Sequence, residues 1–158
     1  NKLKEKVMGL EQDKNNKASI VPEIDPEVLA KAQRVLEEMA EDYPDWVNGL
    51  IRELNDLRQR CVDEPDARRG LFERVAAIAH DMKGQGGTFG YPLITDFADS
   101  LYRIANIRKG YSDSQVEIIK AHIDAMKAVI RERVAGDGGE IGRQLTTGLK
   151  STIEKLRA

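Results

Sequence analysis

The chain has little of several things that define common protein classes. Its single cysteine, Cys61, excludes a framework of disulfides within the chain. Aromatic residues make up only 5% of the 158 residues, and no apolar run is long enough to cross a bilayer. The formal net charge is only -2. Without an excess of positive charge, we expect no binding to nucleic acid or to an anionic membrane surface.

Histidine is also scarce, because the chain has only His80 and His122, far apart in the sequence. This spacing argues against a structural zinc site, which needs several closely organised ligands. A carboxylate-bridged di-metal bundle needs paired Glu-x-x-His elements, but Ala77 and Ile119 stand three residues before the two histidines. We therefore expect no bound metal. His122 has no acidic or cysteine partner at metal spacing, and we interpret it as either a solvated histidine or one at the edge of a helical bundle.

What the chain does contain is typical of a helical protein. Charged residues make up 33% of it, and apolar residues recur at spacings of three and four. Nothing resembles a strand, so we predict the all-α class. Short connections between long amphipathic segments favour antiparallel neighbours in a bundle. The predicted helices cover residues 26–41, 45–62, 66–88, 91–109, 113–133 and 141–156.

Caps and prolines set several of these boundaries. Asp25 directly precedes a proline, which is a favourable N-cap and first-turn pair, and Ser112 or the aspartate after it can cap a later helix. Pro44 is predicted to divide the first amphipathic stretch into two helices. Residues 1–20 are polar and lysine-rich, and we interpret them as a flexible or partly helical tail. Residues 21–158 then form one helical domain.

The segment 79–90 has the most informative composition in the chain, with one histidine, one lysine and four glycines. On a helical projection at about 100° per residue, a narrow and mainly apolar stripe gathers on one side. His80 points away from this stripe, on the same side as Lys83. Gly84 and Gly87 also lie on the histidine side. The stripe, which should face a core, consists of Leu71, Val75, Ile78, Met82, Gly86 and Phe89.

These neighbours suit a histidine that another protein must reach. Imidazole is mostly neutral near pH 7, and its free nitrogen can attack a phosphoryl group to form phosphohistidine. Lys83, three residues after His80, is a helical neighbour whose ammonium could offset the charge on the phosphoryl oxygens. Each glycine costs about 1 kcal/mol in a helix interior. The absence of side chains would let a bulky partner approach, which explains why such costly residues are present.

The run His-x-x-Lys-Gly that starts at His80, with a further glycine at Gly90, resembles the signature of histidine phosphotransfer (HPt) domains. These domains are the relay modules of bacterial two-component signalling. The family's pattern has a large apolar residue before the lysine and another apolar residue before the last glycine, and Met82 and Phe89 stand at these positions. Gln85 departs from the pattern, because the family often has serine or alanine directly after the first glycine.

The resemblance implies an HPt-like antiparallel four-helix bundle with additional N- and C-terminal helices, and an exposed active histidine near the middle of one helix. It implies a phosphorelay intermediate in which His80 exchanges a phosphoryl group with the aspartate of a response-regulator receiver domain. Lys83 would stabilise the phosphoryl charge. The receiver would supply the Mg²⁺, so we expect no cofactor on this chain. We also expect a monomer in the cytoplasm.

The expected partners are a receiver domain, a hybrid histidine kinase, or both. No ATP-binding element is visible, so we expect a signalling protein without kinase activity of its own. The alternative is a non-catalytic helical adaptor that binds a receiver or kinase partner, and a weaker one is a metal-binding bundle. The expected docking face surrounds His80, with apolar help from the helix after Tyr91, and comprises Glu73, Ala76, Lys83, Gly84, Gln85 and Gly87.

Overall fold

The structure is a computed structural model that describes residues 24–157. These residues form five α-helices and one 3-10 helix with no strand among them, so the predicted all-α class is confirmed. The predicted tail, residues 1–20, lies outside the described residues. The helices are α2 (Pro26–Asp63), η1 (Pro65–Ala67), α3 (Arg68–Lys83), α4 (Pro92–Ala105), α5 (Asp113–Arg131) and α6 (Gly139–Arg157).

Helix α2 corrects a prediction, because it continues without interruption through Pro44. A proline in a helix interior cannot donate a hydrogen bond to the residue four positions earlier, and it costs about 3 kcal/mol. Here Tyr43 and Pro44 are both buried, and no glycine lies within four residues on either side to end the helix. Burial of the two side chains offsets the missing hydrogen bond, so the two predicted helices are one.

Two predicted helix starts are confirmed by their caps. At the start of α2, the carboxylate of Asp25 accepts a hydrogen bond from the backbone N–H of Glu27 at 2.9 Å. At the start of α5, Ser112 Oγ accepts from the backbone N–H of Gln115 at 3.2 Å, and Gln115 Oε1 accepts from the backbone N–H of Ser112 at 2.7 Å. This reciprocal capping box satisfies two backbone donors and fixes where α5 begins.

The chain divides into two compact units at the junction of Pro44 and Asp45. Of the first unit, the structure describes residues 24–44, nearly all of them within α2. The second unit contains the rest of α2, all later helices and most of the buried apolar side chains. Its part of α2 buries one face at spacings of three and four, formed by Val47, Ile51, Leu54, Leu57 and Cys61.

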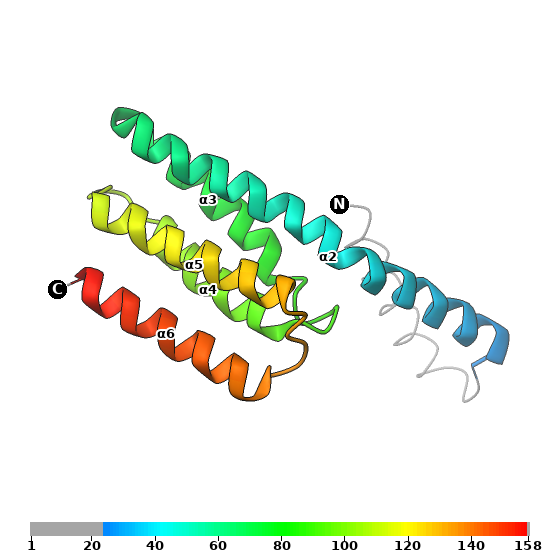
Figure 1. Cartoon of the computed structure of the whole chain (residues 1–158). Helices are drawn as coiled ribbons and strands as arrows, with labels where there is room; N and C mark the ends of the chain where they lie inside the picture. Colours follow the sequence, from blue (N-terminus) through cyan, green and yellow to red (C-terminus); the bar gives the residue numbers. More distant parts are fainter. Residues whose placement is uncertain (1–23, 158) are drawn as a thin grey trace. The chain divides into compact units, whose positions relative to one another are not determined.

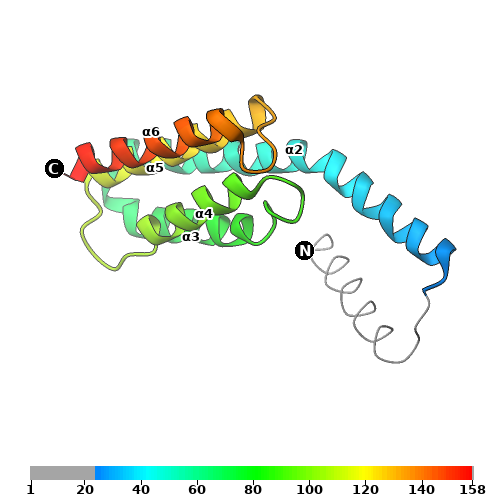
Figure 2. The ribbon, with the colours of Figure 1, turned by 90° about the horizontal axis from the view of Figure 1, so that it is seen from below.

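Within the second unit, each helix from α3 to α6 packs against the next one in the chain. Consecutive helices run in opposite directions, which the short connections between them favour (Figure 1 and Figure 2). Helix α6 packs against α5, and this contact gives the predicted C-terminal helix its place. The largest fully buried apolar side chains of these helices are Phe72, Met82, Ile94, Leu101, Ile119, Ile123, Met126 and Ile130.

A buried cation joins three segments of the second unit. Arg68, at the start of α3, donates from Nε to the carbonyl oxygen of Cys61 at 2.8 Å and from Nη1 to that of Tyr111 at 3.1 Å. Its Nη2 lies 2.8 Å from Asp113 Oδ1. Burying a charge is costly unless it is paired. Because Arg68 has all three partners, it can fix the end of α2 and the start of α5 to α3.

His122 is a second correction, because its side chain is 0% exposed rather than solvated. Its Nδ1 lies 2.7 Å from the carbonyl oxygen of Ile118, and its Nε2 lies 2.7 Å from Ser100 Oγ on α4. A carbonyl oxygen can only accept, so we assign the proton to Nδ1, and Nε2 accepts from the Ser100 hydroxyl. With both nitrogens satisfied, the histidine is a core residue that binds α5 to α4.

Candidate functional site

The helix that carries His80 is shorter than the sequence predicts. Helix α3 ends at Lys83, whereas the predicted helix extends to residue 88. Four of the seven residues in 84–90 are glycines, and each weakens a helix by about 1 kcal/mol, so the helix stops where they begin. Gly90 has a φ of 90°, in the left-handed region that favours glycine. His80 therefore lies in the last turn of α3 and not near the middle of a helix.

The glycine turn packs closely against the start of α4. A Cβ on Gly86 would lie 2.8 Å from the backbone nitrogen of Thr95 and 2.8 Å from the carbonyl oxygen of Tyr91. The backbone N–H of Gly87 donates to Thr95 Oγ1 at 2.9 Å. Gly86 is buried, so its predicted inward position is confirmed. Only glycine fits here, and its absence of a side chain serves the packing of the turn.

His80 and Lys83 meet at one aromatic ring of α4. The centre of the His80 ring lies 5.6 Å from the centre of the Tyr102 ring, and Lys83 Nζ lies 4.6 Å from that same centre. The His80 side chain is 57% exposed and that of Lys83 is 32% exposed. The imidazole is therefore open to a partner, while the ammonium lies against the ring face in a cation–π contact.

Carboxylates lie beside both groups. Lys83 Nζ is 3.7 Å from Asp99 Oδ1, and Asp99 Oδ2 is 3.5 Å from Arg103 Nη2. His80 Nδ1 is 4.0 Å from Asp81 Oδ1. These separations are longer than those of strong charge-assisted hydrogen bonds, and solvent weakens such exposed pairs. The contacts of Lys83 can therefore be exchanged at small cost. We call His80, Lys83, Asp99 and Tyr102 the His80 cluster.

A groove of about 370 Å³ lies beside the cluster, between α3 and the end of α4. Small side chains widen it, and Asn106 Nδ2 donates to the Tyr102 hydroxyl at 3.1 Å. The groove includes Glu73 and Ala76, two residues of the predicted docking face. Glu73 is exposed, but Ala76 is buried, with 6% of its surface exposed, so its predicted exposure is corrected. Its lining residues are Glu73, Ala76, Ala77, His80, Asp81, Tyr102, Ala105, Asn106 and Ile107.

The glycine turn contributes to the docking face differently from the prediction. Gly84 and Gly87 are exposed, but Gln85 is buried, with 5% of its surface exposed. Its Oε1 is buried too, and it accepts no hydrogen bond from the residues that the structure describes. At about 100° per residue Gln85 falls beside the apolar stripe and away from His80, so its burial agrees with the helical projection. The predicted contact of Gln85 with a partner is therefore corrected, since a partner cannot reach its side chain.

Sequence reasoning expected apolar help from the helix after Tyr91 but missed the polar groups that this helix, α4, supplies to the site. Asp99 and Tyr102 lie three residues apart on one face of α4, and Asn106 follows directly after the helix ends. A polar face on an otherwise apolar helix was the available signal. Helical periodicity alone could not show that the polar face of this helix, and not its apolar face, lies beside His80.

No family model, curated protein or solved structure matches this chain. A function must therefore be argued from the chemistry of the site. Among residues 24–157, no group of three or more histidine, cysteine, aspartate or glutamate side chains is placed to hold a metal ion. In the same part of the chain, no helix is both long enough and apolar enough to cross a membrane.

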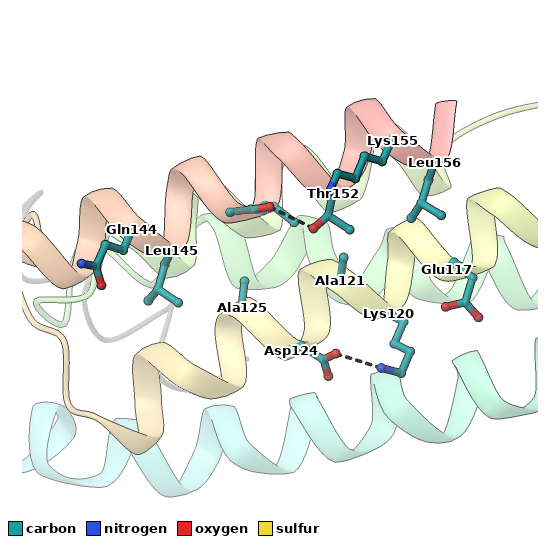
Figure 3. Close-up of a pocket in the computed structure, with 12 residues that line it drawn as sticks. Glu117, Lys120, Ala121, Asp124, Ala125, Gln144, Leu145, Thr152, Lys155 and Leu156 are labelled. Carbon is teal, nitrogen blue, oxygen red and sulfur yellow. Dashed lines mark hydrogen bonds and ion pairs between the residues drawn. The ribbon is translucent and has the colours of Figure 1, made fainter. Parts of the chain in front are cut away.

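A second groove, of about 580 Å³, lies between α5 and α6 (Figure 3). The α6 side of the groove is lined by Leu145, Leu149 and Leu156. The α5 side carries an ion pair in which Lys120 Nζ lies 3.0 Å from Asp124 Oδ2. The groove shares no lining residue with the one beside His80, and neither histidine nor cysteine lines it. It therefore offers no nucleophile comparable to His80.

Proposed function

We propose that the chain is a phosphorelay intermediate in which His80 accepts a phosphoryl group from the phosphorylated aspartate of a receiver domain and can return it. The observation that carries the proposal is the meeting of an exposed imidazole and a lysine ammonium at the Tyr102 ring. The imidazole is a nucleophile, and the ammonium can balance the charge that the nucleophile acquires. No other described part of the chain brings these two groups together beside a groove.

The nitrogen that attacks would be Nε2. The Asp81 carboxylate lies 4.0 Å from Nδ1 and would repel an anionic phosphoryl group there. In the transfer, the lone pair of Nε2 forms a bond to phosphorus while the bond from phosphorus to the aspartyl oxygen breaks. The receiver regains its carboxylate, and His80 becomes phosphohistidine. Most of the acceleration would come from positioning and charge stabilisation.

The place of His80 in α3 makes a cation beside it important. The last turn of a helix carries partial negative charge from its unpaired carbonyl groups, which disfavours an added anion. Lys83 lies in the same turn, and its flexible stem lets the ammonium move from Asp99 and Tyr102 toward the phosphoryl oxygens. The ammonium of Lys83 would thus offset both the negative charge of the phosphoryl group and the partial negative charge at the end of the helix.

The fold proposed for this role is an HPt-like four-helix bundle made of the second half of α2 with α3, α4 and α5, with α6 as an additional helix. Two findings support it: α3, α4 and α5 pack in succession, and Glu53 Oε1 of α2 lies 3.9 Å from Arg74 Nη2 of α3. The receiver partner, in the cytoplasm, would supply the Mg²⁺ and the acidic residues that bind it. The chain would have no kinase activity of its own.

The test is transfer of labelled phosphate from phosphorylated receiver domains of the source organism. The wild-type chain should take label from at least one receiver, and His80→Gln should take none because it lacks the nucleophile. His122→Gln, with its fold checked by circular dichroism, is the matched control and should keep the label. If His80→Gln is still labelled, the relay proposal is wrong. If the wild-type chain binds a receiver but takes no label from any, the chain is an adaptor.

A further inference from the structure

The first unit presents an apolar helix face to solvent. Within residues 26–42 of α2, Val28 is 46% exposed, Leu29 is 44% exposed and Leu36 is 39% exposed. Single exposed apolar residues are ordinary, but these recur along one side of the helix. Such a stripe marks an interaction surface when its members are adjacent. The apolar stripe consists of Val28, Leu29, Ala32, Val35 and Leu36, of which Ala32 and Val35 are half-buried. Met39 continues the spacing but is buried, with 7% of its surface exposed.

The stripe follows the seven-residue repeat of a coiled coil. Ala32 and Met39 are seven apart and take position a of the repeat, and Val28 and Val35 take position d. Position e is Leu29 and Leu36. Position g is Lys31 and Glu38, both of which are exposed and opposite in charge. The charged positions thus border the apolar ones on one side only.

These positions are complementary to a second copy of the same helix in the antiparallel direction. In that geometry position a faces position d of the partner, so Ala32 meets the partner's Val35. The same alignment places Lys31 opposite the partner's Glu38, and Leu29 opposite the partner's Leu36. Each contact occurs twice about a two-fold axis between residues 33 and 34. In a parallel pair, position g would face the leucines at position e, and Lys31 would have no partner charge.

In place of the monomer expected from the sequence, we infer that residues 26–42 of α2 form an antiparallel two-helix interface with a second copy of this chain. The partner helix is a second copy of this chain, because the alignment that brings the apolar positions together also places Lys31 of one copy opposite Glu38 of the other. The interface is small, and it should give a dimer that dissociates on dilution. It uses none of the residues of the His80 cluster, so it stands independently of the proposed phosphotransfer.

The experiment measures the mass of the full chain by sedimentation equilibrium from about 1 µM to about 1 mM, the range in which small interfaces dissociate. The wild-type mass should rise from 17.7 kDa toward twice that value. Lys31→Glu places like charges opposite each other twice per dimer, and so does Glu38→Lys. Each single variant should raise the dissociation constant about tenfold or more.

Mixing the two single variants is the decisive step. In a mixed pair, the glutamate introduced by Lys31→Glu faces the lysine introduced by Glu38→Lys, and the unchanged Glu38 of the first chain faces the unchanged Lys31 of the second. The mixture should therefore form a heterodimer about as tight as the wild-type dimer. The inference fails if the wild-type chain stays at 17.7 kDa, or if the mixture is as weak as the single variants. It also fails if only a chain without residues 1–20 dimerises, which would assign the stripe to the chain's own first residues.

Discussion

Lys83 has two partners that a phosphoryl group on His80 would have to replace. Its ammonium lies 3.7 Å from Asp99 Oδ1 and 4.6 Å from the centre of the Tyr102 ring. Asp99 is itself shared with Arg103, so its charge is partly balanced without Lys83. The competition is therefore between an exposed carboxylate and a phosphoryl group that carries more charge. Asp99 would set how readily the lysine moves.

We predict that Asp99→Asn speeds phosphoryl transfer to His80 or lengthens the life of phosphohistidine by about two- to fivefold, the size expected for an exposed ion pair of up to 1 kcal/mol. The amide keeps the shape but removes the charge that holds Lys83. Lys83→Ala should slow the transfer or shorten the lifetime. Both are measured as the rates at which label enters and leaves the chain.

The control for this pair is Asp124→Asn, which removes another exposed carboxylate paired with a lysine, at 3.0 Å from Lys120 on α5. It should leave both rates unchanged. The double variant of Asp99→Asn and Lys83→Ala should behave like Lys83→Ala alone, because Asp99 acts through the lysine. If Asp99→Asn still changes the rates without Lys83, its influence does not pass through that side chain.

At the scale of the residue, the sequence could predict side-chain positions that depend on a single helix. His80 and Lys83 lie on the exposed side of α3, as the projection places them, because both are within the helix. Gln85 is buried beside the apolar stripe, where the same projection places it, so its assignment to the docking face was wrong. Ala76 is on the His80 side of the projection but is only 6% exposed. Tyr102 and Asp99 come from α4, and their place beside His80 depends on how two helices pack.

Among the elements, the turn between α3 and α4 is held by a close backbone contact. Gly86→Ala should destabilise the fold by about 1–3 kcal/mol, the usual cost of overpacking. The new Cβ would lie 2.8 Å from backbone atoms of Tyr91 and Thr95, and backbone moves less easily than a side chain. The free energy of unfolding, measured by urea denaturation, gives the value.

Gly70→Ala is the matched control, because it makes the same substitution within α3 with nothing within 4 Å of the new Cβ. It should stabilise the fold by about 1 kcal/mol, the difference in helix propensity. A Gly86→Ala variant as stable as the wild type would mean that the turn is loosely packed. The position of His80 would then owe little to the contact between the turn and α4.

Element boundaries were predictable where local chemistry sets them. Ser112, one of the two cap candidates in the sequence, is a local signal, and α5 begins directly after it. Pro44 gave an equally local signal and was misleading, because its burial offsets a lost hydrogen bond. The end of α3 was also misplaced, since the apolar spacing continues through Gly86 and Phe89 although the backbone is no longer helical.

At the scale of the whole molecule, His122 connects more elements than any sequence pattern suggested. It is on α5, it binds Ser100 of α4, and Arg103 and Arg157 lie close enough to influence its charge. Burial lowers the pKa of His122, and the two arginines lower it further, against the opposing effect of the hydrogen bond to Ile118. The all-α class followed from spacing alone, but this buried site depends on three helices meeting.

The pKa shift of His122 predicts that the protein loses stability on mild acidification. In the unfolded chain the histidine takes up a proton as the pH falls through 6.5, whereas the folded chain resists protonation until a lower pH. The unfolded state therefore binds more protons below pH 6.5, and the free energy of unfolding should fall by up to about 1.4 kcal/mol per pH unit. Urea denaturation between pH 7.5 and about pH 5, above the range in which most carboxylates titrate, measures this slope.

His122→Gln should lower stability at every pH and flatten the slope, whereas the matched variant His80→Gln retains His122 and should retain the slope that His122 causes. An unchanged slope in His122→Gln would assign the acid sensitivity to other groups.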